Sequence, residues 1–232
     1  MKRPLLIALA LLSVPGFAAL GIWQLERLQW KLDLIARVEA RIHAPPAPLP
    51  DAAQWAGLDR RDYEYRRVRA QGRFLHDRET LVQALTERGA GFWVLTPLRT
   101  AQGLVLVNRG FVPPDKRGAA SRAAGLVPGP VTVTGLMRAS EPKGTLLRAN
   151  DPQARRWYSR DVAAIAAARG LGPVAPFFVD ADATPNPGGY PVGGLTVVRF
   201  RNSHLVYALT WFALAALGAA GAFLLLRTRA QQ

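Results

Sequence analysis

The chain has 232 residues, 50% of them hydrophobic, and a formal net charge of +14. This length allows one globular domain of moderate size. The sequence contains no cysteine, which excludes a disulfide framework, a thiolate zinc or iron–sulfur site, covalent c-type haem attachment and a cysteine nucleophile. The basic residues are dispersed rather than clustered with aromatic side chains, so the charge favours anionic membrane lipid over nucleic acid as a partner.

The hydrophobic residues collect near the two ends of the chain. Leu5 to Trp23 gives nineteen residues without a charge, and Leu205 to Leu226 gives twenty-two. Each segment is long enough to cross a bilayer core of about 30 Å as a helix. All sixteen acidic residues and twenty-six of the thirty basic residues lie between them. The sequence therefore predicts a membrane protein with a polar central region.

The first apolar segment has an alternative interpretation as a secretory signal, because residues 16–18 (Gly-Phe-Ala) form an acceptable small-x-small cleavage site. Against this, apolar residues continue beyond the segment at spacings of three and four. They are Leu25, Leu28, Leu32, Ile35, Val38 and Ile42. We expect one long helix that leaves the bilayer as an amphipathic stalk. Four prolines at positions 45, 46, 48 and 50 then end it and form a stiff linker.

Charges near the spans do not settle the orientation by themselves, since more Lys and Arg flank the central region than occupy the tails. Long loops translocate largely regardless of charge, however, and a Lys-Arg tail ahead of the first span normally stays in the cytoplasm. We therefore predict that both termini are cytoplasmic. The expected segments are a tail (1–4), transmembrane helix 1 (5–23), a juxtamembrane amphipathic helix (24–44), an extracytoplasmic mainly β domain (45–203), transmembrane helix 2 (204–226) and a second tail (227–232).

The central region contains the alternation and the apolar runs that are typical of strands. Expected strands are Tyr65–Phe74, Phe92–Leu98, Leu104–Asn108, Val131–Met137, Pro176–Asp180 and Leu195–Phe200, with a hairpin turn at Gln102-Gly103. Only Asp161–Arg169 is predicted to be helical, while 117–130 and 188–194 are expected to be loops. The predicted fold class is an α+β membrane protein, in which two transmembrane helices flank one mainly antiparallel β-sheet domain.

The sequence carries no motif of an established catalytic site. There is no Gly-x-Ser-x-Gly, His-Glu-x-x-His or phosphate-binding glycine loop, so an enzymatic function has no support. The three histidines, His43, His76 and His204, are scattered and the two methionines do not join them. Copper delivery, which needs soft ligands in close array, is therefore not indicated.

His204 is the candidate of interest because it begins the second apolar segment. Tyr207, Ala208 and Trp211 follow at spacings that place them on the same helix face. An ionisable residue at the edge of a span usually faces a partner or a cavity. Alternatively, His204 and Trp211 belong to the interfacial aromatic belt. Further along, small residues permit close packing on another helix: Ala215, Gly218, Ala219 and Ala222.

Two more groups of residues allow either a structural or a binding role. Trp23, Arg27 and Trp30 share a face at the outer end of the first helix, where they could anchor the chain or contact a ligand. A row of arginines on one strand face could bind anionic groups such as haem propionates, or form a solvated surface. This row consists of Arg67, Arg69 and Arg73, with Arg109 expected nearby.

Four segments together resemble the motifs of the Surfeit locus protein 1 family, the assembly factors of haem-copper cytochrome c oxidase. They are Gly21–Lys31 (GIWQLERLQWK), Gly91–Leu98 (GFWVLTPL), Val105–Pro113 (VLVNRGFVP) and Asn202–Phe212 (NSHLVYALTWF). They follow the order of the family and span nearly the whole chain. Phe111 stands where tryptophan is expected, and Ser203 where a second asparagine is common, which affects local packing only.

The resemblance implies a non-enzymatic chaperone in the bacterial inner membrane, with most of the chain in the periplasm. It implies that the protein accepts haem a from haem A synthase and passes it to oxidase subunit I, with His204 as the ligand of the haem iron. Tyr207, Trp211, Trp23 and Arg27 are further candidates for contact with this cofactor. The alternative is a cofactor-free scaffold that stabilises an oxidase assembly intermediate.

Overall fold

The computed structural model of the protein describes residues 2–145 and 147–230. The chain divides into two compact units. The helical unit comprises Met1–Arg37 and Val198–Gln232, and the β unit comprises Val38–Val197. Residue 1 and residues 231–232 of the two predicted tails lie outside the described residues.

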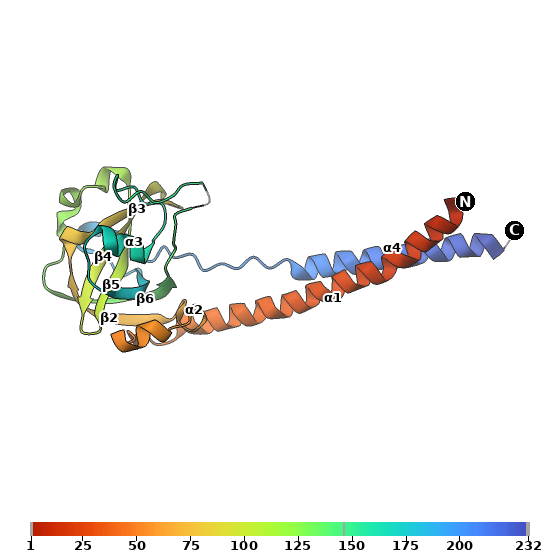
Figure 1. Ribbon diagram of the computed structural model, residues 1–232, viewed down its shortest axis with the longest axis horizontal. Coiled ribbons are helices and arrows are strands. Elements are labelled where there is room, and N and C mark those ends of the chain that lie inside the picture. Colours follow the sequence, from red (N-terminus) through yellow and green to blue (C-terminus); the bar gives the residue numbers. More distant parts are fainter. Residues whose placement is uncertain (1, 146, 231–232) are drawn as a thin grey trace. The chain divides into compact units, whose positions relative to one another are not determined.

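Two long helices build the helical unit, as Figure 1 shows. α1 (Lys2–His43) is continuous from the first apolar segment into the predicted amphipathic stretch, and α4 (His204–Ala230) follows the β unit in the chain. Both are long and apolar enough to cross a membrane. Two candidate membrane helices near the ends of the chain are thus confirmed, whereas the division of α1 into a span and a stalk stays a prediction.

Small residues bring α1 and α4 together as an antiparallel hairpin. Ala208, Ala215 and Ala222 are buried and recur every seven residues along α4, which is the period of a packed helix seam. A Cβ on Gly218 would lie 2.8 Å from Oγ of Ser13 on α1. The prediction that Ala215, Gly218 and Ala222 permit close packing is therefore confirmed, but it is wrong for Ala219, which is exposed.

Outside this seam the hairpin presents an apolar surface. Large side chains are exposed along both helices, among them Leu9, Leu12, Leu209, Leu217 and Phe223. A continuous apolar surface of this size is stable only when lipid or another protein covers it. The exposure pattern is therefore that of a helix pair in a bilayer.

A seven-stranded sheet forms the β unit within the described residues. Its strands are β1 (Ala47–Pro48), β2 (Arg67–Phe74), β3 (Thr80–Thr86), β4 (Gly89–Thr100), β5 (Gly103–Val112), β6 (Pro130–Ala139) and β7 (Val174–Ala181). They lie in the order β1-β2-β6-β7-β5-β4-β3, with parallel pairing only of β1 with β2 and of β5 with β7. The prediction of a mainly antiparallel sheet with a hairpin turn before Gly103 is confirmed.

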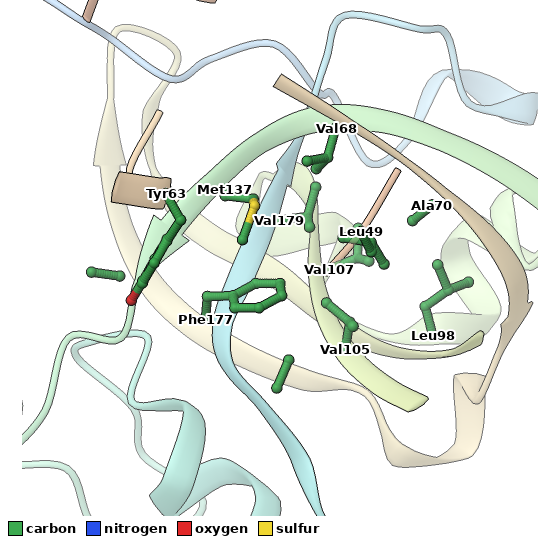
Figure 2. Packing of buried hydrophobic residues seen from close by; sticks show 12 residues of the cluster. Leu49, Tyr63, Val68, Ala70, Leu98, Val105, Val107, Met137, Phe177 and Val179 are labelled. Atoms are coloured by element: carbon green, nitrogen blue, oxygen red, sulfur yellow. The ribbon is translucent and has the colours of Figure 1, made fainter. Parts of the chain in front are cut away.

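The sheet closes into a barrel because β2 pairs with β6 along most of its length and with β4 at its end. Where β2 begins to pair with β4, the chain needs glycine, because a Cβ on Gly72 would collide with the carbonyl group of Arg99 on β4. Inward-facing residues of the closed strands form the main core. Figure 2 shows this cluster, in which Val68, Val107 and Phe177 come from different strands.

A second core lies between the outer face of the sheet and α3 (Val162–Ala168). The carboxylate of Asp161 caps this helix by accepting a hydrogen bond from the Ala164 N–H, which satisfies one of the unpaired donors at its N-terminus. Ile165 then packs against Phe178 of β7 and Leu106 of β5. The predicted helix is therefore confirmed. A four-residue helix, α2 (Arg60–Tyr63), is an element that the sequence did not indicate.

Two predicted elements are wrong. The segment Leu195–Phe200 is not a strand, and the strand that precedes it in the chain, β7, already pairs with β5 on one side and β6 on the other. The prolines after α1 do not form a free linker, since Ala47 and Pro48 pair with β2 and Leu49 is buried in the core.

The strand β3, which pairs with β4 along its length, was not predicted from the sequence. The expected loops also contain short 3-10 turns at Ala119–Gly125 and Pro187–Gly189.

The seam between α1 and α4 generates a prediction. A Cβ on Gly21 would lie 2.6 Å from the ring of Phe212, so Gly21→Leu should disturb the packing of the two helices. Overpacking of this kind typically lowers stability by about 1–3 kcal/mol. Because the chain has no cysteine, Ser13→Cys with Gly218→Cys should form an interhelical disulfide, and its yield reports hairpin packing. Gly21→Leu should lower this yield. The matched control is Gly16→Leu, since no atom lies within 4 Å of a Cβ there. Equal yields in the two variants would contradict the seam.

Candidate functional site

The first turn of α4 and the facing turn of α1 bring two polar side chains together. Nδ1 of His204 lies 2.8 Å from Oε1 of Gln24. Both residues are half-buried on the seam, one turn from the buried Ala208 and Gly21 respectively. The sequence placed His204 in a candidate site but did not assign a role to Gln24. Its position in the sequence could have indicated the contact, because Gln24 lies three residues after Gly21, on the face of α1 that meets α4.

This hydrogen bond determines which ring nitrogen of His204 is free. A carboxamide oxygen can only accept a hydrogen bond, so Nδ1 carries the proton and donates it to Gln24. In neutral imidazole the other nitrogen, Nε2, then holds a lone pair. Histidines that bind metals have this arrangement, in which the second nitrogen donates to an oxygen that fixes the tautomer and the ring orientation. The His204 ring is therefore prepared to act as a single nitrogen ligand.

Aromatic rings adjoin the polar pair on the same seam. Trp211 stacks on Phe17 of α1, with ring centroids 5.7 Å apart and an interplanar angle of 21°. Phe212 covers Gly21, the residue one turn before Gln24. The imidazole thus lies at the end of an apolar, aromatic seam.

The other sequence-predicted residues of the helical unit lie away from this seam. Tyr207 is 54% exposed, so it does not share the inner face with His204 and Trp211. Trp23 and Trp30 are 53% and 45% exposed, and the guanidinium of Arg27 stacks 3.9 Å from the centre of the Trp30 ring. Trp23, Arg27 and Trp30 therefore form an outward-facing aromatic and cationic surface on α1, which we call the Trp–Arg surface.

The arginine row on β2 is only partly as predicted. Arg69 and Arg73 are exposed and Arg67 is half-buried, on the face opposite Val68 and Ala70. Arg109 does not join them, because its buried guanidinium stacks on Phe74, which faces away from the row. The physical reason is register, since residue 109 of β5 shares the inward face of Val105 and Val107.

A buried charge cluster in the β unit was not predicted either. The carboxylate of Asp180 on β7 accepts hydrogen bonds from Asn108, Arg138, Arg160 and the hydroxyl of Thr196, at 2.7 to 3.1 Å. Its side chain is 2% exposed and lines a cleft of about 310 Å³. The acceptor lone pairs of Asp180 are thus engaged by residues of β5, β6 and two loop segments, as expected of a buried carboxylate that joins parts of a fold.

Arg160 joins this cluster to Glu141. Burial on its own raises the pKa of Glu141, but hydrogen bonds from Arg160 outweigh it and hold the pKa below its ordinary value. Burial on its own lowers the pKa of Arg160, but the charges of Asp180 and Glu141 outweigh this effect and raise the pKa above its ordinary value. Both groups are therefore ionised at neutral pH, and the cluster holds paired charges rather than a group ready to transfer a proton.

No other arrangement in the described parts of the chain resembles a metal centre. Across residues 2–145 and 147–230, no three His, Asp or Glu side chains gather closely enough to hold a metal ion. The ring of His76 interacts with the carbonyl oxygen of Val127, and His43 interacts with its own helix through Glu39.

Comparison with known proteins gives a consistent family assignment. The model of the SURF1 family matches residues 11–216. Surfeit locus protein 1 of Rattus norvegicus is 36% identical over 224 residues, which cover 89% of this chain and 71% of that protein. The human protein of the same name is 36% identical over 90% of this chain and 73% of its own. A SURF1-like protein of Monosiga brevicollis is 41% identical, with coverages of 90% and 83%.

The pairing of His204 with Gln24 can be tested on the protein alone. Gln24→Leu removes the acceptor, so the His204 ring should lose its fixed Nδ1–H tautomer and populate the Nε2–H form. Nitrogen-15 NMR of histidine-labelled protein in lipid nanodiscs would measure the two forms, with the His204 signal assigned from His204→Ala. Gln29→Leu is the matched control, because Gln29 lies on the same helix and donates to Asp33. An unchanged tautomer in Gln24→Leu would remove Gln24 from the site.

Proposed function

Because this chain belongs to the SURF1 family, we propose that it is an assembly factor of haem-copper cytochrome c oxidase that binds haem a and delivers it to subunit I. The observation that carries the proposal is the His204 ring, which donates through Nδ1 to Gln24 and keeps Nε2 as a free ligand atom. Imidazole is a common axial ligand of haem iron. The chemistry of the seam therefore fits this cargo.

The surroundings of His204 suit a ligand that must also be released. Trp211 and Phe17 supply apolar rings on the same seam, two helical turns from the imidazole, and these make the surroundings suitable for an apolar macrocycle. In the described part of the chain no second histidine or methionine lies on the seam, since His43, His76 and Met137 belong to the β unit. One axial bond gives weaker retention than two, which suits a carrier that passes its cargo on.

The Trp–Arg surface has a separate role in this proposal. Flat rings and a stacked guanidinium, exposed on the outer face of α1, provide the residue types that dominate protein contact sites. We assign this surface to docking, either of subunit I or of the edge of the haem. Tyr207, which is exposed on α4, is the remaining candidate for cofactor contact.

The proposal places the protein in the bacterial inner membrane, with both termini in the cytoplasm and the β unit in the periplasm. The exposed apolar faces of α1 and α4 contact membrane lipid. Haem A synthase donates the haem in this scheme, and oxidase subunit I receives it. In this scheme the protein performs no chemical step itself.

His204→Ala tests the proposal most directly. Loss of the axial ligand should lower the haem a content of the purified protein strongly and leave the oxidase short of haem, while insertion and folding stay normal. Gln24→Leu should have a smaller effect, because loss of an orienting partner typically costs about 10–100-fold in affinity. The measurement is a pyridine haemochrome assay with a visible spectrum on protein from cells that make haem a.

The other two histidines are the controls. His43→Ala and His76→Ala should keep wild-type haem content, because both residues belong to the β unit. His204→Met should bind haem with a shifted spectrum, because a thioether is a softer ligand. Full haem content in His204→Ala would contradict the ligand assignment. A wild-type protein without haem that still supports oxidase assembly would favour the cofactor-free scaffold.

A second prediction concerns the Trp–Arg surface. Replacement of Trp23, Arg27 and Trp30 by Leu, Lys and Leu keeps hydrophobicity and charge but removes the rings and the planar guanidinium. Membrane insertion should remain normal while oxidase activity in the cell falls. Immunoblots would confirm equal amounts of protein. If oxidase activity is unchanged at equal protein level, these residues serve only as an interfacial anchor.

A further inference from the structure

Arg109 is a buried cation, and its hydrogen-bond acceptors among the described residues are all neutral. The residue is 2% exposed, at the end of the inward face of β5. Its Nη2 donates to the carbonyl oxygen of Gly125 and to Oδ1 of Asn186, and its guanidinium stacks 4.7 Å from the centre of the Phe74 ring. Arg122, the other arginine among the buried residues, forms an ion pair with Glu79. Arg109 forms no ion pair among the described residues, and the charge of Glu79 only partly offsets the effect of its burial.

Two nitrogens of the same guanidinium are unused. Nε and Nη1 of Arg109 are buried and have no hydrogen-bond partner among the described residues. Burial lowers the pKa of Arg109 to about 10, so the group remains charged at neutral pH. A buried charge with unsatisfied donors is costly unless an anion or another acceptor meets it. The site therefore favours a negatively charged group.

The surroundings of Arg109 define the size and polarity of such a ligand. Arg109 lines a cleft of about 180 Å³ at one end of the barrel, between β6 and the segment 182–187. Its walls are mainly apolar and include Phe74, Val107, Val127, Val131 and Val133. The one carboxylate in the lining, Asp182, is occupied locally, because its Oδ1 accepts from the N–H and the hydroxyl of Thr184. A small space with apolar walls and a cation at one side matches a short chain that ends in an anion.

We propose that this cleft binds a carboxylate carried on a short apolar chain, with the carboxylate on the side of the cleft lined by Arg109. The carbon chain lies along the valines of β5 and β6. A carboxylate is preferred because its charge offsets that of the buried guanidinium and its oxygens accept charge-assisted hydrogen bonds. This inference concerns the β unit alone and does not depend on haem binding at His204.

Titration calorimetry on the full chain in lipid nanodiscs tests the proposal, with pentanoate as the probe and pentanamide as its neutral counterpart. Pentanoate should bind at least tenfold more tightly than pentanamide. Shorter acids should bind more weakly, by about fourfold for each methylene removed, because each buried methylene contributes about 0.8 kcal/mol. Equal binding of pentanoate and pentanamide by the wild-type protein would overturn the proposal without any variant.

Three variants locate the site. Arg109→Gln should abolish the preference for pentanoate over pentanamide, and near-ultraviolet circular dichroism would show whether the barrel is intact. Val127→Phe, in a loop that lines the cleft, should weaken the binding of both probes while Arg109 is retained. Arg69→Gln is the matched control, because Arg69 is exposed on the outer face of β2. The proposal fails if Arg109→Gln keeps the preference, or if Arg69→Gln loses it as strongly.

Discussion

The pairing of β2 with both β6 and β4 is the constraint on which the β unit depends. It closes the sheet, so each strand of the ring has one face toward the barrel interior and one face toward α3 or solvent. β7 is paired on both sides, so the chain after Pro191 adds no strand beside it. Backbone hydrogen bonds join Val192 to Phe111 and Gly194 to Ala181, and the hydroxyl of Thr196 donates to Asp180. The same closure fixes Asn108 on the outer face and Arg109 on the inner face. One backbone register thus creates both the buried charge cluster and the isolated buried cation.

The helical unit obeys a different constraint, close approach of two backbones. In lipid there is no hydrophobic gain from joining helices, so association depends on packing and on interhelical hydrogen bonds. Gly21, Ala208, Ala215 and Gly218 supply the packing, and the His204–Gln24 pair supplies a hydrogen bond where the seam ends. Because the same contact fixes the imidazole tautomer, the stability of the hairpin and the proposed ability of His204 to bind a metal depend on each other.

Periodicity was sufficient for the elements that have a strong local signal. The two apolar helices, the helix capped by Asp161 and the alternating strand at 67–74 are confirmed, because each follows from the side-chain pattern of its own residues. Leu195–Phe200 has the same strand-like composition, but β7, the strand that precedes it in the chain, is already paired on both sides. The contact of Gln24 with His204 and the Asp180 cluster were not predicted for a related reason. Their contacts join residues far apart in sequence, and Gln24 meets a side chain 180 positions away.

The same argument explains why arginine is difficult to interpret from sequence in this chain. Arg69 and Arg109 both lie in strands, yet only the register of the closed barrel determines that one is exposed and the other buried. An exposed arginine is solvated and contributes little to binding, whereas a buried one must be met by a negative or polar partner. Arg122, Arg138 and Arg160 are met by Glu79, Asp180 and Glu141 within the fold. Arg109 is stacked on Phe74 and forms no ion pair among the described residues, and two of its nitrogens have no hydrogen-bond partner there, which is the physical basis for the proposed ligand at this end of the barrel.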